Sequence, residues 1–73
     1  MKASSAFVTD QCVGIIGLGL VGTALATRLK KAGYRCIGFD VRNEAMLVFE
    51  AAGFKACESV ISILNQTNTL VLA

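Results

Sequence analysis

The sequence contains no histidine, the commonest general base and metal ligand in proteins. It has no proline and few charges: 16% of its 73 residues are charged, whereas 55% are hydrophobic. Such high hydrophobicity with a net charge of only +2 excludes a disordered chain. Five acidic residues offset the seven basic ones, so the sequence shows no cluster of basic residues typical of nucleic-acid binding. The length allows one small domain at most.

Cysteine is also scarce, with single residues at Cys12, Cys36 and Cys57. An odd number of cysteines without C-x-x-C spacing argues against a disulfide framework and against a zinc site. We expect these residues to be small buried hydrophobes in a reducing compartment, and we expect a cytoplasmic protein without a bound metal.

One long apolar run, CVGIIGLGLVGTALATRL at residues 12–29, approaches the length of a membrane span, which needs about 20 residues. The run contains four glycines, Gly14, Gly17, Gly19 and Gly22. None of them are four residues apart, as they would be on a helix-pairing face. A short membrane protein remains an alternative, but a buried strand followed by a tight turn and a helix explains the glycines better, so we expect no membrane partner.

In that interpretation, residues 12–16 form the strand and residues 17–22 match the motif G-x-G-x-x-G. Gly17 permits the turn, Gly19 the approach of a pyrophosphate, and Gly22 close packing of the helix on the strand. The backbone amides at the start of the helix then point at the phosphates. Leu18, Leu20 and Val21 supply further amides or apolar contacts to the cofactor, although their side chains are equally suited to the core.

The segment YRCIGFD predicts a second strand, residues 34–39, followed by Asp40. Asp40 lies 23 positions after Gly17, close to the offset of roughly 20 expected for a carboxylate that binds the adenosine ribose. Such a carboxylate repels a 2′-phosphate and favours NAD over NADP. The alternatives are an ordinary loop aspartate at this position and a glycine turn without a ligand.

The rest of the chain continues the alternation of helix and strand. A helix capped by Asn43 and closed by Gly53, a strand at 54–57, a helix capped by Ser59 and a strand at 69–73 are predicted. The fold class is therefore α/β, an incomplete Rossmann-type parallel sheet of order 3-2-1-4. Two helices cover one face and the third covers the other. Residues 1–11 are expected to form a loose tail, and residues 12–73 a partial dinucleotide-binding domain whose fourth strand needs further chain or a partner.

The stretch VGIIGLGLVGTALATRLKKAGYRCIGFDVRNEAMLVFEAAGFKACESV resembles the N-terminal region of the β-hydroxyacid dehydrogenases, which include 3-hydroxyisobutyrate and 6-phosphogluconate dehydrogenases. Their signature is I-G-x-I/F-G-L-G-x-M-G, and Val21 replaces its methionine. The resemblance covers about residues 12–73. It implies an oxidoreductase that transfers a hydride between a nicotinamide and a 3-hydroxy acid.

The resemblance places the family's substrate-binding glycine motif and catalytic lysine after Ala73, so no catalytic residue is assigned and this chain alone is not expected to catalyse. NADP-preferring relatives have Asn-Arg-Thr where this chain has Asp40, Val41 and Arg42. NAD is therefore the expected cofactor and NADP remains possible, with Arg42 at the phosphate, along the adenine, or in solvent. The sequence also fits another Rossmann enzyme, such as an FAD-dependent one, or a non-catalytic nucleotide-binding or interaction module.

Overall fold

A computed structural model describes residues 11–73, so the expected tail, apart from Gln11, lies outside the described residues. Seven elements follow one another along this part of the chain. They are β1 (Cys12–Ile16), α2 (Leu20–Lys31), β2 (Arg35–Phe39), α3 (Asn43–Ala51), β3 (Lys55–Ala56), α4 (Val60–Leu64) and β4 (Thr69–Leu72).

The four strands form one parallel sheet in the order β3-β2-β1-β4, which confirms the predicted topology. β1 lies at the centre, with Val13 paired to Cys36 of β2 and to Thr69 of β4. Because helices cover both faces, β1 and β2 are apolar without alternation.

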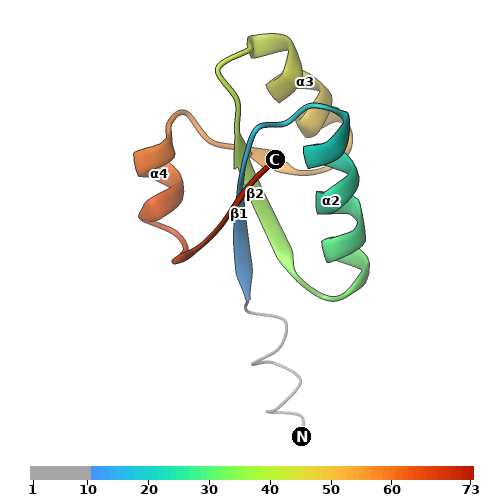
Figure 1. Cartoon of the computed structure of the whole chain (residues 1–73), viewed down its shortest axis with the longest axis vertical. Coiled ribbons are helices and arrows are strands. Elements are labelled where there is room, and N and C mark those ends of the chain that lie inside the picture. The colour runs from blue at the N-terminus through green and yellow to red at the C-terminus, as the bar shows by residue number, and fades with distance from the viewer. Residues whose placement is uncertain (1–10) are drawn as a thin grey trace, which may run out of the picture.

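The helices form the two outer layers: α2 and α3 pack on one face of the sheet and α4 on the other (Figure 1). The core under α2 and α3 includes Ile15 and Phe49, whereas the core under α4 is formed around Ile37 and Ile63. Gly14 faces α4, where an added Cβ would run into the side chain of Ile63. This contact explains the glycine within the first strand as a requirement of close packing.

Some element ends differ from the prediction. Asn43 is the first residue of α3 and Arg42 occupies the cap position without a side-chain cap, because the Asp40 carboxylate turns the chain there by accepting the Arg42 N–H. β3 is shorter than residues 54–57: it begins at Lys55, since the Phe54 N–H donates to the Phe49 carbonyl in α3, and it ends at Ala56, although the Cys57 N–H still donates to the Gly38 carbonyl of β2 at 2.7 Å. The predicted cap of α4 is confirmed: the Ser59 hydroxyl accepts the N–H of Ser62 at 3.1 Å.

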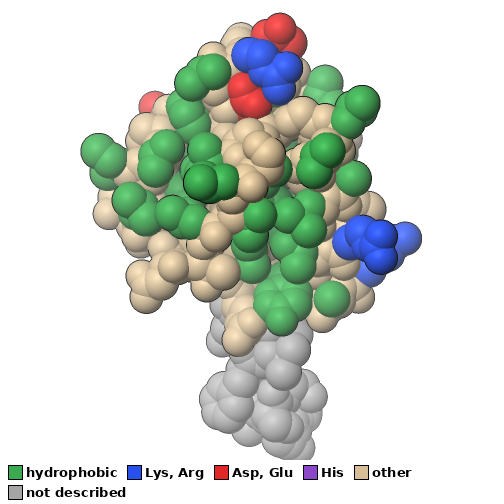
Figure 2. Space-filling view, viewed as in Figure 1, with side chains coloured by type: hydrophobic (Ala, Val, Ile, Leu, Met, Phe, Trp, Pro, Cys, Tyr) green, Lys and Arg blue, Asp and Glu red, His purple; other side chains and the backbone are tan. Residues whose placement is uncertain are grey.

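The apolar run of residues 12–29 is divided between β1 and α2, and within residues 11–73 no helix has the length and hydropathy to cross a membrane. β4, drawn in red, ends at the C-terminus in the middle of the visible face (Figure 1). Hydrophobic side chains gather on this face (Figure 2). Among the described residues β4 pairs with β1 alone, so its second edge carries no strand.

Candidate functional site

The turn between β1 and α2 depends on Gly17, whose φ of +99° lies in the left-handed region. Its N–H donates to the carbonyl of Phe39 at 2.9 Å, which fixes the turn to the end of β2. A Cβ at this position would lie 2.7 Å from the carbonyl oxygen of Ala73. Both the backbone angle and the crowding therefore require glycine here.

Gly22 lies in the first turn of α2 and packs directly on that bend, because an added Cβ would overlap the carbonyl oxygen of Gly17. The helical hydrogen bonds begin with the Thr23 N–H, which donates to Gly19 at 3.0 Å. The three preceding amides, those of Leu20, Val21 and Gly22, consequently have no partner inside the helix. Such amides, together with the positive end of the helix dipole, suit an anion.

Leu18 anchors the loop to the core. Its side chain is 1% exposed and covers Gly38 of β2, where an added Cβ would come within 2.6 Å of Leu18 Cδ2 and 2.9 Å of a Phe49 ring carbon. No role for Gly38 was predicted from the sequence, although a glycine inside a strand is itself a signal of close approach. The loop therefore rests on a strand that leaves room for it.

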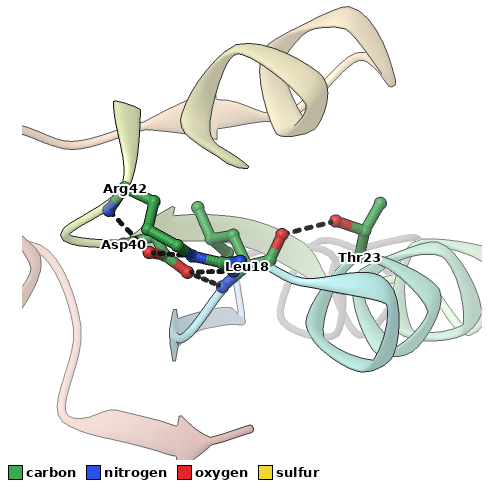
Figure 3. Close-up of polar contacts among 4 residues, drawn as sticks. All are labelled: Leu18, Thr23, Asp40 and Arg42. Carbon is green, nitrogen blue, oxygen red and sulfur yellow. Dashed lines mark hydrogen bonds and ion pairs between the residues drawn. The ribbon is translucent and has the colours of Figure 1, made fainter. Parts of the chain in front are cut away.

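Asp40 follows β2 and joins the glycine loop before α2 to the segment before α3 (Figure 3). Its Oδ2 accepts the Leu18 N–H at 2.7 Å, and its Oδ1 accepts the Arg42 N–H at 2.7 Å. Because the Leu18 N–H already donates to Asp40, it is not free for a ligand, and Leu18 serves to position the loop. Thr23 adds a weaker contact, with its hydroxyl 3.4 Å from the carbonyl oxygen of Leu18.

The guanidinium of Arg42 pairs with the same carboxylate (Figure 3), a contact that the sequence did not reveal. Nε donates to Asp40 Oδ1 and Nη2 to Oδ2, both at 3.1 Å. Hydrogen bonds from the Arg42 side chain, and then from the backbone N–H groups of Arg42 and Leu18, hold the pKa of Asp40 well below its usual range. The carboxylate is thus charged at neutral pH.

These groups surround one hollow of about 400 Å³ at the carboxyl ends of the strands. Its lining consists of Gly17, Gly19, Leu20, Val21, Gly22, Asp40, Arg42 and Ala73. Seven of the nine predicted site residues thus meet at one place; Leu18 lies beneath the loop, and Val41 follows Asp40 with an exposed side chain. Ala73 was not predicted, although the strand order brings the end of β4 to this edge.

The donors and the acceptor of this site fit a dinucleotide. The free amides at the start of α2 suit a pyrophosphate, and the charged carboxylate at the end of β2 suits a ribose diol. Gly17 and Gly22 keep the bend compact, because a Cβ on either would collide with a backbone oxygen. At Gly19, the position expected to let a phosphate approach, the one atom near an added Cβ is Arg42 Nη2 at 3.4 Å. The geometry therefore supports binding by backbone donors and one carboxylate.

Comparison with known proteins agrees with this geometry and with the resemblance seen in the sequence. Residues 12–73 match the family described as the NAD binding domain of 6-phosphogluconate dehydrogenase. The chain is similar to the NAD(+)-dependent, decarboxylating 6-phosphogluconate dehydrogenase of Haloferax volcanii, with 32% identity over 54 residues. That match covers 74% of this chain and 18% of the relative. The chain belongs to the family of NAD binding domains of 6-phosphogluconate dehydrogenase, which confirms NAD as its cofactor at the level of the family.

Proposed function

We propose that the hollow at the β1–α2 turn is where the dinucleotide binds. The amides of Gly19, Leu20, Val21 and Gly22 would receive the pyrophosphate, and Asp40 the adenosine ribose diol. One observation carries this assignment: the Leu18 N–H donates to Asp40 Oδ2 at 2.7 Å, which places the carboxylate directly beside the glycine loop. Diphosphate and ribose are adjacent in a dinucleotide, and so are these two groups in the chain's fold.

The charge on Asp40 sets the proposed preference for NAD over NADP. The 2′-phosphate of NADP would lie beside a carboxylate that stays ionised at neutral pH, and two neighbouring negative charges repel each other. Gly17 shapes the bend, while the exposed side chains of Leu20, Val21 and Val41 offer apolar contact to the cofactor's rings. The guanidinium of Arg42 softens the preference, and NADP remains a weaker ligand.

For the complete protein, we infer hydride transfer between a nicotinamide and a 3-hydroxy acid in the cytoplasm. The chain spans 18% of the length of the relative it matches, and no lysine of the chain matches the family's catalytic motif. Substrate binding and catalysis would then depend on a further part of the protein or on a partner chain, which would also cover the free edge of β4. A non-catalytic nucleotide-binding module is the alternative if the reading frame beyond Ala73 lacks that motif.

The test is calorimetric titration of the 73-residue chain with NAD, NADP and FAD. Asp40→Asn removes the charge and weakens the diol contact, so NAD affinity should fall about ten-fold or more while the preference over NADP narrows. Glu50→Gln is the matched control, because Glu50 is an exposed acid on α3 outside the hollow.

Unchanged affinities in Asp40→Asn, with circular dichroism showing an intact fold, would remove Asp40 from the site. Tighter binding of FAD than of either nicotinamide dinucleotide would favour another Rossmann enzyme. Binding of none of the three would instead favour an interaction module.

A further inference from the structure

We propose that Arg42 is a latch on the ribose-binding carboxylate: in the free protein its guanidinium occupies the two acceptor positions that a ribose diol needs, and NAD binding exchanges guanidinium for diol. This inference rests on the proposed function and adds the residue that sets the affinity and selectivity of the same site. It concerns the resting state of the site, before any ligand arrives.

The acceptor count of Asp40 carries the first step. An ionised carboxylate offers about four lone-pair positions. Four donors fill them: on Oδ2 the Leu18 N–H and Arg42 Nη2, and on Oδ1 the Arg42 N–H and Arg42 Nε. Asp40 is also only 7% exposed. A diol therefore has no free position on this carboxylate until a donor leaves.

The two kinds of donor differ in how easily they leave. The Leu18 and Arg42 N–H groups belong to backbone fixed by the glycine loop and by the start of α3. The Arg42 guanidinium, in contrast, is carried on a flexible side chain that is 56% exposed. It also borders a second hollow of about 390 Å³ between α2 and α3, which Arg42 and Val48 help to line. The side chain thus has space to move into, and a binding diol can replace both of its hydrogen bonds.

The latch has two consequences of opposite sign. The guanidinium competes with the ribose diol for Asp40 and so weakens the binding of NAD. It also neutralises the charge of Asp40 and so reduces the repulsion between that carboxylate and the 2′-phosphate of NADP. Loss of the guanidinium should therefore raise the affinity for NAD and lower the affinity for NADP. An arginine whose main role is to stack on the adenine predicts the reverse for NAD, because its loss would remove a ligand contact.

The experiment measures dissociation constants for NAD and NADP in the wild-type chain, in Arg42→Gln and in the control Arg35→Gln. Arg35 is an exposed residue at the opposite end of β2, so its loss changes net charge equally. We expect NAD to bind Arg42→Gln about two- to five-fold more tightly, the range set by an exposed ion pair, and NADP to bind more weakly. Arg35→Gln should change both constants little and by a similar factor.

A second readout is the exchange of the Arg42 Nε–H with water, followed by NMR in the free chain. The pair should protect this proton relative to that of Arg35, and saturating NAD or Asp40→Asn should remove the protection. Equal exchange for the two arginines in the free chain would overturn the latch. NAD binding by the wild type with equal or weaker binding by Arg42→Gln would overturn it too, yet leave the proposed function standing. Failure of every variant to bind any dinucleotide would instead overturn the proposed function, and the latch with it.

Discussion

At the residue scale, Asp40 has a structural role as well as its proposed role in binding. It is the only buried charged residue among residues 11–73, and its carboxylate joins the glycine loop to the start of α3. Each of its contacts is a hydrogen bond to the ionised form, so protonation weakens all of them together. The same residue that would receive the ribose therefore holds its own binding loop in place.

This coupling predicts a particular dependence of stability on pH. Because the pKa of Asp40 is lower in the folded chain than in the unfolded one, its contribution is fully present above the ordinary aspartate pKa near 4. It is lost as the pH falls from there toward the lowered value. Urea unfolding of wild type and Asp40→Asn at pH 7, 4 and 2.5 should show a difference in the free energy of unfolding that shrinks with acidity. A difference that stays constant over this range would contradict the role of the charge.

The glycine motif and Asp40 were predictable because their chemistry is expressed in spacing along the chain. The pairing of Arg42 was not, because it depends on how the chain turns after β2 and on which rotamer the guanidinium adopts. The sequence left three destinations open for Arg42, namely a 2′-phosphate, the adenine and solvent, and none of them was the neighbouring carboxylate. Contacts of a side chain with its near neighbours depend on the folded structure even where the backbone pattern is clear.

At the scale of elements, the loop before α2 is anchored by an apolar contact that the motif G-x-G-x-x-G does not encode. Leu18 is buried over Gly38, whereas Leu20 is 93% exposed. The motif G-x-G-x-x-G treats both as variable positions, and only the longer family signature, which has leucine at the position of Leu18 and any residue at that of Leu20, separates them. The end of β2 decides between them, since only Leu18 points at a strand residue without a side chain.

Leu18→Ala and Leu20→Ala form a matched pair for this contact. Leu18→Ala should lower the free energy of unfolding by about 2–5 kcal/mol, because it leaves a cavity under the loop. Leu20→Ala should change it by less than about 0.5 kcal/mol. Chemical denaturation measures both. Similar losses for the two variants would mean that the loop is not anchored through Leu18.

Element ends were the least predictable feature of the fold. Periodicity placed every helix and strand, but β3 is shortened because Phe54 donates to α3, and α3 already includes Asn43, the residue expected to cap it. Both shifts follow from hydrogen bonds that the surrounding chain makes, one at the end of α3 and one at its start. Such bonds depend on the assembled fold and not on local propensity.

At the scale of the whole molecule, the chain order determines which strands form the two edges of the sheet, and within residues 11–73 these are the short β3 and the longer β4. Right-handed crossovers predict the order 3-2-1-4 from the sequence alone, and with it a fourth strand that pairs on one side only. The sequence shows that β4 is apolar, but not which of its side chains stay exposed. Leu72 is 81% exposed, and the face of Figure 2 is rich in hydrophobic side chains.

An apolar strand edge favours pairing with another chain, so the isolated 73-residue chain should self-associate as its concentration rises. Leu72→Lys places a charge at the edge and should reduce that association. Leu47→Lys is the control, because Leu47 is exposed on α3, away from β4. Sedimentation velocity compares the three chains. Equal suppression by both lysines would assign the association to general hydrophobicity and not to the β4 edge.

The central claim is that bare amides at the start of α2 and the carboxylate at the end of β2 bind NAD together. An NMR titration of the ¹⁵N-labelled chain with NAD tests it most directly. We predict saturable shifts of the amide signals of Gly19, Leu20, Val21 and Gly22, together with those of Val41 and Arg42 beside the carboxylate. Saturating NAD that leaves these amides unchanged, or that shifts only the signals of α4 and β3, would contradict the account.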